Sequence, residues 1–252
     1  MFVADLHNDL VQRMMIGEDV TKNTSSGHTD IERLKLSSID LEVMIVWASE
    51  KEANTSYFDF ASKMYDKLKA LNKIEGVTVP QTLDDIKSAK EKNELSLPIG
   101  MEGGEALENK IENLEYFINK GLFYFGPTWN HSLDWVSSGY GETHKKNSLK
   151  SYGLNEFGIE VIHTCQENNV LIDVSHIGEK SFWDIKENSK KPFIASHSSV
   201  HNLCPHFRNL KDDQIKAIKD AKGLVGLNPY PFFIDPKFKI REEKIRNQYR
   251  KK

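Results

Sequence analysis

Side chains that commonly bind divalent metals recur along this 252-residue chain, each just after a short apolar run. The first are His7 and Asp9. In an extended strand, residues i and i+2 lie on the same face, so this imidazole and carboxylate can reach one ion together. Alone the pair is weak evidence, because an aspartate that caps a turn beside an incidental histidine is commoner.

Three further residues strengthen the case. Glu102 precedes two glycines, which permit a sharp backbone turn, and His176 and His197 each follow an apolar run. Taken alone, Glu102 would be interpreted as a loop residue, and either histidine as a structural residue. Together they predict one site, with His7 and Asp9 on one metal, His176 and His197 on the other, and Glu102 bridging both.

Two ions bridged by a carboxylate lie about 3.5–4 Å apart, lower the pKa of a shared water and polarise a carbonyl. This chemistry suits hydrolysis of an amide or a related bond. Glu102 is therefore the catalytic candidate as well as a metal ligand.

The ligands need a scaffold that gathers strand ends. Apolar runs that alternate with helical patterns predict a parallel sheet, because each parallel crossover needs a helix-sized connection. This pattern favours an α/β fold of the TIM-like (β/α)8 type, in which the C-terminal strand ends meet at one mouth. The predicted strands are residues 2–6, 40–47, 97–101, 123–125, 170–174, 192–196 and 224–228; the predicted helices are 57–71, a segment capped by Thr82, 111–118, 157–165, 182–188 and 212–221.

Composition limits the function classes. Hydrophobic residues make up 38% and the net charge is −3, so no basic field invites nucleic acid or an acidic membrane. Cys165 and Cys204 form no metal or disulfide motif. The N-terminus lacks a signal-peptide pattern and no apolar run approaches a membrane span, so we expect a cytoplasmic protein without membrane contact.

Two stretches lack a clear pattern. Residues 129–152 are polar and rich in Gly and Ser, and they are predicted to lie over the barrel mouth. Residues 241–252 are basic and have no apolar period, which predicts a frayed, solvated tail. The expected organisation is a barrel domain over 1–240 followed by this tail.

Several segments resemble the membrane (renal) dipeptidase family of zinc peptidases, peptidase family M19. The resemblance runs from residue 5 to about residue 234, and its most specific segment is ASHS…RNL within 192–210. The matching segments are DLHNDL (5–10), HTDIERLK (28–35), GMEGGEAL (100–107), GLNEFG (153–158), LIDVSH (171–176), PFIASHSSVHNLCPHFRNL (192–210) and GLVGLNPYPFFI (223–234).

The resemblance implies two Zn²⁺ ions, with other divalent metals as alternatives, and hydrolysis of dipeptides, including those with a C-terminal D-residue. It assigns Glu102 to both ions and Arg208 to the substrate carboxylate. The best-known members of the family have a histidine in the loop after the fourth strand, which is assigned to the substrate carbonyl. Here Trp129 stands at that position, followed by Asn130, so these two are the substrate-binding candidates; His131 could take over the role.

The family pattern continues beyond the point where this chain departs from it, near Arg241, and the continuation includes an eighth strand and an aspartate that handles the catalytic water. We therefore expect about seven strands of a truncated barrel, with turnover open. Two alternatives remain: an inactive metal-binding or self-associating chain of the same family, or another amidohydrolase-like barrel that acts on a lactam, lactone or phosphoester. The latter commonly have HxH on the first strand, whereas HxD stands here.

Overall fold

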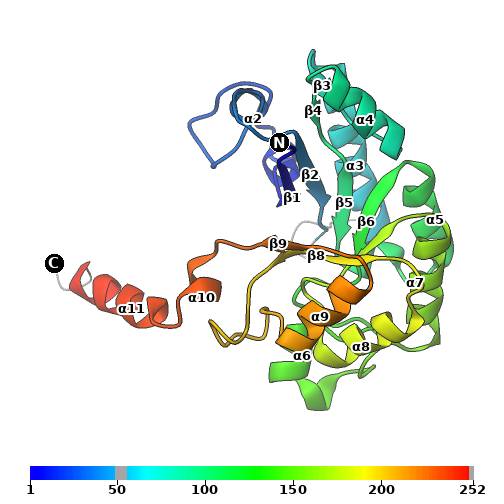
Figure 1. Ribbon diagram of the computed structural model, residues 1–252, viewed down its shortest axis with the longest axis vertical. Helices are drawn as coiled ribbons and strands as arrows, with labels where there is room; N and C mark the ends of the chain where they lie inside the picture. Colours follow the sequence, from blue (N-terminus) through cyan, green and yellow to red (C-terminus); the bar gives the residue numbers. More distant parts are fainter. Residues whose placement is uncertain (49–55, 250–252) are drawn as a thin grey trace.

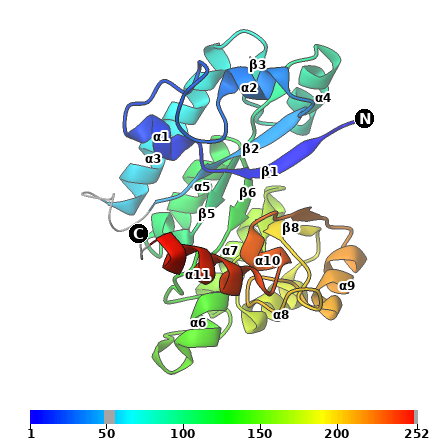
Figure 2. The same cartoon turned by 90° about the vertical axis from the view of Figure 1, so that its left-hand side faces the viewer.

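The computed structural model describes residues 1–48 and 56–249. One parallel sheet of nine strands runs in the order β3-β4-β2-β5-β6-β7-β8-β9, and β1 pairs with β2. The sheet curls into half a barrel, as Figures 1 and 2 show. The strands are β1 (Ala4–Asn8), β2 (Leu41–Val46), β3 (Val77–Thr78), β4 (Leu95–Ser96), β5 (Ile99–Glu102), β6 (Leu122–Gly126), β7 (Leu171–Asp173), β8 (Phe193–Ser198) and β9 (Val225–Leu227).

Helices connect most of the successive strands, except β4 and β5, and several of them cover the outer face of the curled sheet (Figure 1). The helices are α1 (Val11–Met15), α2 (Ile31–Leu36), α3 (Tyr57–Lys69), α4 (Leu83–Glu91), α5 (Ile111–Asn119), α6 (Gly139–His144), α7 (Glu156–Glu167), α8 (Glu179–Asn188), α9 (Asp212–Asp220), α10 (Pro231–Ile234) and α11 (Phe238–Tyr249), with short 3₁₀ turns at Ala70–Lys73, Gly104–Leu107 and Lys146–Ser148.

The α/β prediction is confirmed. All seven predicted strands are present, with ends displaced by no more than two residues. The two strands that the sequence did not predict, β3 and β4, have two residues each and pair with one another. Such short strands show no alternation of apolar and polar residues, so they give no periodic signal.

The core has two parts on the two faces of the sheet. The larger fills the space between the strands and the outer helices, and its largest members include Phe117, Phe125 and Trp135. The smaller lies on the inner, concave side, where the barrel interior would be, and its members are Leu41, Val43, Ile45, Tyr124 and Ile194. Both parts hold the strand ends at fixed positions.

The cap predicted at Thr82 is present. The Thr82 side chain accepts a hydrogen bond from the Asp85 backbone N–H, and the Asp85 carboxylate accepts one from the Thr82 backbone N–H, which completes a capping box at the start of α4. We expect Thr82→Ala to lower the free energy of unfolding by about 1 kcal/mol, because a helix donor loses its partner. Urea denaturation would measure this. Glu91→Ala, an exposed change on the same helix, is the control and should stay within about 0.5 kcal/mol of the parent protein.

Residues 129–152 are more ordered than their polarity suggests. They contain α6, and Trp135 is fully buried with its ring 5.6 Å from that of Phe157, edge to face. The sequence pattern predicted neither this helix nor the burial of Trp135. Trp135 contributes buried apolar area here, although the many Gly and Ser residues around it make the stretch look polar in the sequence.

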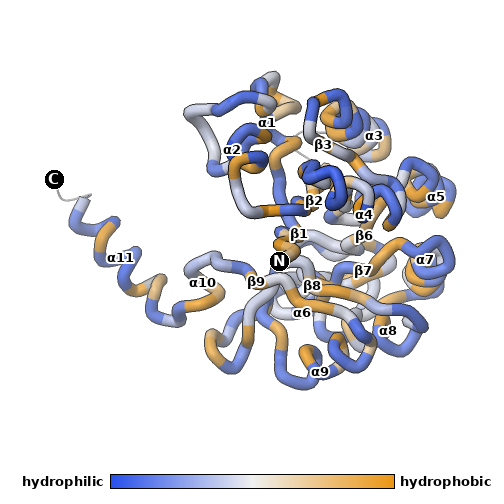
Figure 3. The backbone as a smooth tube through the Cα atoms, turned by 45° about the horizontal axis from the view of Figure 1, so that its top comes forward, coloured by the Kyte–Doolittle hydropathy of each residue, from blue (hydrophilic) through white to orange (hydrophobic). Residues whose placement is uncertain are grey.

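Residues 241–249, predicted as a frayed tail, instead continue α11, which projects away from the body of the molecule (Figure 3). Most of its side chains are exposed, and Arg246 pairs with Glu242 one turn earlier. Residues 250–252 of the predicted tail lie outside the described residues. Within the described part of the chain, no helix is long and apolar enough to cross a membrane.

Candidate metal centre

The five predicted metal ligands come together at the C-terminal ends of four strands. His7 lies near the end of β1 and Asp9 follows it, Glu102 is the last residue of β5, His176 follows β7, and His197 lies in β8. The backbone turns sharply directly after Glu102, where Gly103 has a φ of +90°. Only a glycine takes that conformation without strain, which is the role expected of it.

One carboxylate oxygen is the centre of the cluster. Glu102 Oε1 lies 3.7 Å from His7 Nε2, 3.0 Å from His176 Nε2 and 3.6 Å from His197 Nε2. His7 Nε2 also lies 3.7 Å from Asp9 Oδ1. The Glu102 side chain is buried, yet Oε1 has no hydrogen-bond partner of good geometry in the described part of the chain. A buried anionic oxygen in this situation is costly unless a cation binds it.

The spacing of the donor atoms fits a metal. Zinc–nitrogen bonds of about 2.0–2.1 Å in a tetrahedron place neighbouring ligand atoms about 3.3 Å apart. The Nε2 atoms of His176 and His197 are 3.0 Å apart, close to this value and to their distances from Glu102. Two groups of three ligands share Glu102: His7, Asp9 and Glu102 form one, and Glu102, His176 and His197 form the other.

The electrostatics suit metal binding. Burial opposes ionisation of Glu102, but the His176 and His7 imidazoles outweigh it and lower the pKa of this carboxyl to about 2. Burial, reinforced by the Arg208 charge, lowers the pKa of His176; burial, with His7 and Arg208, lowers that of His197 well below its ordinary value. The carboxylate is therefore ionised and these two imidazoles are neutral near pH 7, which are the forms that bind metals.

Two residues that the sequence analysis missed hold His197. The Ser196 hydroxyl lies 2.7 Å from His197 Nδ1 and 2.6 Å from Asp173 Oδ2. Asp173 is buried and accepts four hydrogen bonds in all, from Ser175 and Ser196. It also lies within a third cluster, with His7 and His197. Oδ1 accepts three of these hydrogen bonds and Oδ2 accepts the fourth, from the Ser196 hydroxyl, so Asp173 helps to orient His197 through Ser196.

Arg208 lies beside the predicted second metal position. Its Nη2 donates a hydrogen bond of 2.8 Å to His197 Nε2, while its buried Nη1 has no partner in the described chain. Burial lowers the pKa of Arg208 to about 10, so the guanidinium keeps its charge at neutral pH. The structure thus places Arg208 beside the cluster, with Nη1 still able to donate hydrogen bonds.

The cluster opens into a cavity of about 440 Å³ whose walls include Trp129, Leu227, Pro229 and Tyr230. The Trp129 ring lies 6.5 Å from that of His176 and 5.0 Å from that of Trp47. Asn130 and His131, by contrast, are not among the residues that line this cavity. Of the loop candidates, only Trp129 reaches it.

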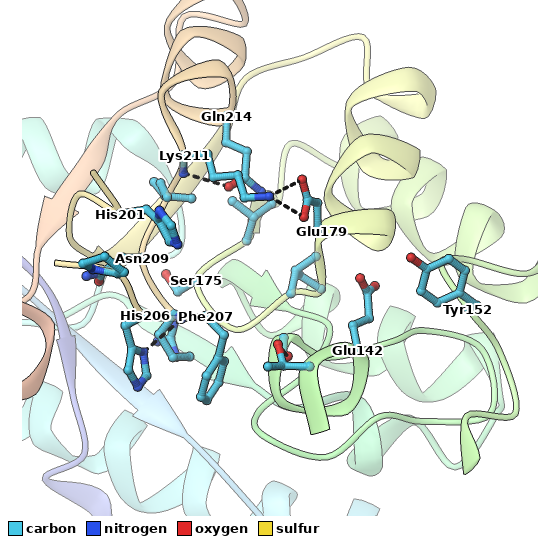
Figure 4. Close-up of a pocket in the computed structure, with 17 residues that line it drawn as sticks. Glu142, Tyr152, Ser175, Glu179, His201, His206, Phe207, Asn209, Lys211 and Gln214 are labelled. Carbon is cyan, nitrogen blue, oxygen red and sulfur yellow. Dashed lines mark hydrogen bonds and ion pairs between the residues drawn. The ribbon is translucent and has the colours of Figure 1, made fainter. Parts of the chain in front are cut away.

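A second cavity, of about 420 Å³, lies between α6, α8, α9 and the segment that carries Arg208. Figure 4 shows charged side chains around it, of which Lys211 pairs with Glu179 at 2.7 Å. Within residues 1–48 and 56–249, none of the clusters of metal-binding side chains includes a residue that lines it. Arg208, whose Nη2 donates to His197 Nε2, is among the residues that line this second cavity and is not among those that line the cavity at the metal cluster.

Comparisons with known proteins identify the family of the chain. A model of the membrane dipeptidase family (peptidase family M19) matches residues 1–248. Human dipeptidase 3 is 26% identical over 233 residues, covering 88% of this chain and 46% of its own length. A crystal structure described as dipeptidase AC, a metallopeptidase of family M19, superposes with a TM-score of 0.83 at 25% identity, covering 94% of this chain and 74% of that one.

A metallopeptidase from Rhodobacter sphaeroides, crystallised with a phosphinate mimic of the dipeptide L-Ala-D-Ala, has the same fold, with a TM-score of 0.82 at 24% identity and coverage of 94% and 76%. The chain spans 46–60% of the length of the curated relatives that it matches. The predicted resemblance is thereby confirmed: the chain belongs to the membrane dipeptidase family, peptidase family M19.

Proposed function

We propose that this protein is a dipeptidase with two Zn²⁺ ions that share Glu102. The observation that carries the proposal is the convergence of three imidazoles and two carboxylates at four strand ends, around a buried carboxylate oxygen to which the described residues supply no hydrogen bond. Imidazole nitrogen together with carboxylate oxygen suits zinc, although the same donors accept other divalent metals.

Two bound ions would supply a hydroxide nucleophile near neutral pH and polarise the scissile carbonyl. The protein would hold them through His7 and Asp9 on one side and His176 and His197 on the other, with Glu102 as the shared ligand. Trp129 and Tyr230, in the cavity wall, would exclude bulk water from the reacting groups.

Arg208 is proposed to bind the substrate carboxylate. The lone pair of His197 Nε2, to which Arg208 now donates, is the one that a metal would take, so metal binding would release the guanidinium. A buried guanidinium keeps its charge and can donate two parallel hydrogen bonds to a carboxylate, which a lysine ammonium cannot do. A free C-terminal carboxylate fixed there would place the single peptide bond of a dipeptide, but not that of a longer chain, beside the metals.

We expect Arg208→Lys to raise KM for L-Ala-D-Ala by about 10- to 100-fold, because two parallel charge-assisted hydrogen bonds become one point contact. The matched control is the C-terminal amide of the same dipeptide, which lacks the anion. If Arg208 binds the carboxylate, the parent enzyme should prefer the acid over the amide and the variant should lose most of this preference. An equal loss on both substrates would show that the arginine acts in some other way.

The substrate class is tested with the zinc-loaded protein and a panel of dipeptides, a tripeptide, a β-lactam, a lactone and a phosphoester. The proposal predicts hydrolysis of dipeptides, including one with a C-terminal D-residue, at a kcat/KM well above that for the other classes. Preferential cleavage of a lactone or phosphoester would replace it with the amidohydrolase-like alternative. Zinc binding without turnover, together with self-association in light scattering, would favour a non-catalytic role.

A further inference from the structure

We propose that Tyr124 is a positioning residue for one of the two metals. Its phenol hydroxyl fixes the tautomer of His7, so that the Nε2 lone pair of this imidazole faces the other ligands. The inference rests on the proposed metal centre. It concerns a residue in the middle of β6 that is not one of the five proposed metal ligands.

The proton positions follow from two contacts of the Tyr124 hydroxyl. Its oxygen lies 3.0 Å from the backbone carbonyl oxygen of Leu6 and 3.0 Å from His7 Nδ1. A carbonyl oxygen can only accept, so the one phenol proton is donated to Leu6. The phenol oxygen must then accept from His7, which places the imidazole proton on Nδ1 and leaves the lone pair on Nε2.

That lone pair points toward the metal centre. His7 Nε2 lies 3.7 Å from both Asp9 Oδ1 and Glu102 Oε1. In the opposite tautomer, the Nε2 proton would point at the carboxylates and no lone pair would be available to a metal. Hydrogen bonds of this kind to the second ring nitrogen orient histidine ligands in metalloproteins generally.

The fold makes room for this contact. Tyr124 is fully buried on the concave side of the sheet, and its paired residue on β5 is Gly100. A Cβ atom on Gly100 would lie 2.8 Å from the tyrosine ring, so the missing side chain gives the ring its space.

The test compares two tyrosines. Tyr124→Phe removes the hydroxyl and keeps the ring. Tyr65→Phe is the matched control, because Tyr65 is also fully buried and donates to a backbone carbonyl, that of Lys120, at 3.1 Å, in the outer core. Zinc affinity is measured by competition with a chromophoric chelator, and the His7 tautomer is read from its ¹⁵N shifts in metal-free protein at pH 7.5.

We expect Tyr124→Phe to weaken one of the two zinc sites by about 10- to 100-fold and leave the other within about twofold. The His7 ¹⁵N shifts should change from the Nδ1–H form to a mixture of tautomers. Tyr65→Phe should alter neither. Unchanged zinc affinity in Tyr124→Phe, or an equal loss in Tyr65→Phe, would overturn the inference.

The two proposals can fail separately. If the parent protein binds no zinc, the proposed function fails, while the tautomer measurement still decides whether Tyr124 controls His7. If the parent binds two zinc ions and Tyr124→Phe binds both as tightly, the metal centre stands and the positioning role is wrong.

Discussion

Replacement of Glu102 with glutamine is expected to reduce dipeptide hydrolysis by at least about 1000-fold, which corresponds to about 4 kcal/mol of transition-state stabilisation. Glutamine has nearly the same shape but no charge, and its amide nitrogen cannot bind a metal. Because Glu102 Oε1 lies within 3.7 Å of three imidazoles, its loss affects both ligand groups at once. Zinc content should therefore fall together with kcat.

The control for this variant is Glu112→Gln, which removes one exposed carboxylate from α5. It should leave zinc content and kcat/KM within about twofold of the parent. Circular dichroism would verify that both variants are folded. A Glu102→Gln protein that keeps two zinc ions and normal turnover would show that this carboxylate is not the shared ligand.

The largest expected loss of stability follows from Phe117→Ala, which should lower the free energy of unfolding by about 3–5 kcal/mol. Phe117 is fully buried on α5, with ring centroids of Phe58, Tyr65 and Tyr116 within 5.8 Å of its own. Alanine leaves a cavity among rigid rings that cannot collapse to fill it. The edge-to-face contacts with Phe58 and Tyr116 are lost as well.

Guanidinium denaturation of the metal-free protein would measure this change without a contribution from bound zinc. Phe2→Ala is the chemically matched control, because Phe2 is half exposed near the N-terminus, and the change should cost less than about 1 kcal/mol. A loss below about 1 kcal/mol for Phe117→Ala would mean that the packing around α5 is looser than the structure indicates.

The sequence predicted which five side chains the structure brings together at the strand ends, because most of them carry a local signal. His7, Glu102, His176 and His197 each stand at the end of an apolar run, and parallel strands in a barrel bring such ends together. The cap at Thr82 was also predictable, since its partner is only three residues away. These predictions depend on neighbours in the chain.

The residues that surround the proposed ligands and the buried tryptophan of residues 129–152 have no comparable signal in the local sequence. Tyr124 is 117 residues from His7, and in the sequence it is one more aromatic residue of an apolar strand. Asp173 interrupts an apolar run but meets Ser196 only when β7 and β8 lie side by side. Trp135 was hidden within a polar stretch. Contacts of this kind depend on which face of each strand turns inward, and that is settled only when the sheet curls.

The central claim is a pair of zinc sites that share Glu102 and serve peptide hydrolysis. It is tested most directly by adding Zn²⁺ in steps to the chelator-stripped protein while L-Ala-D-Ala hydrolysis and bound metal are followed together. The account predicts that hydrolysis is absent without metal, rises with occupancy and levels off at two equivalents per chain. Failure to bind zinc at neutral pH, or binding of two equivalents without any dipeptide cleavage, would contradict it.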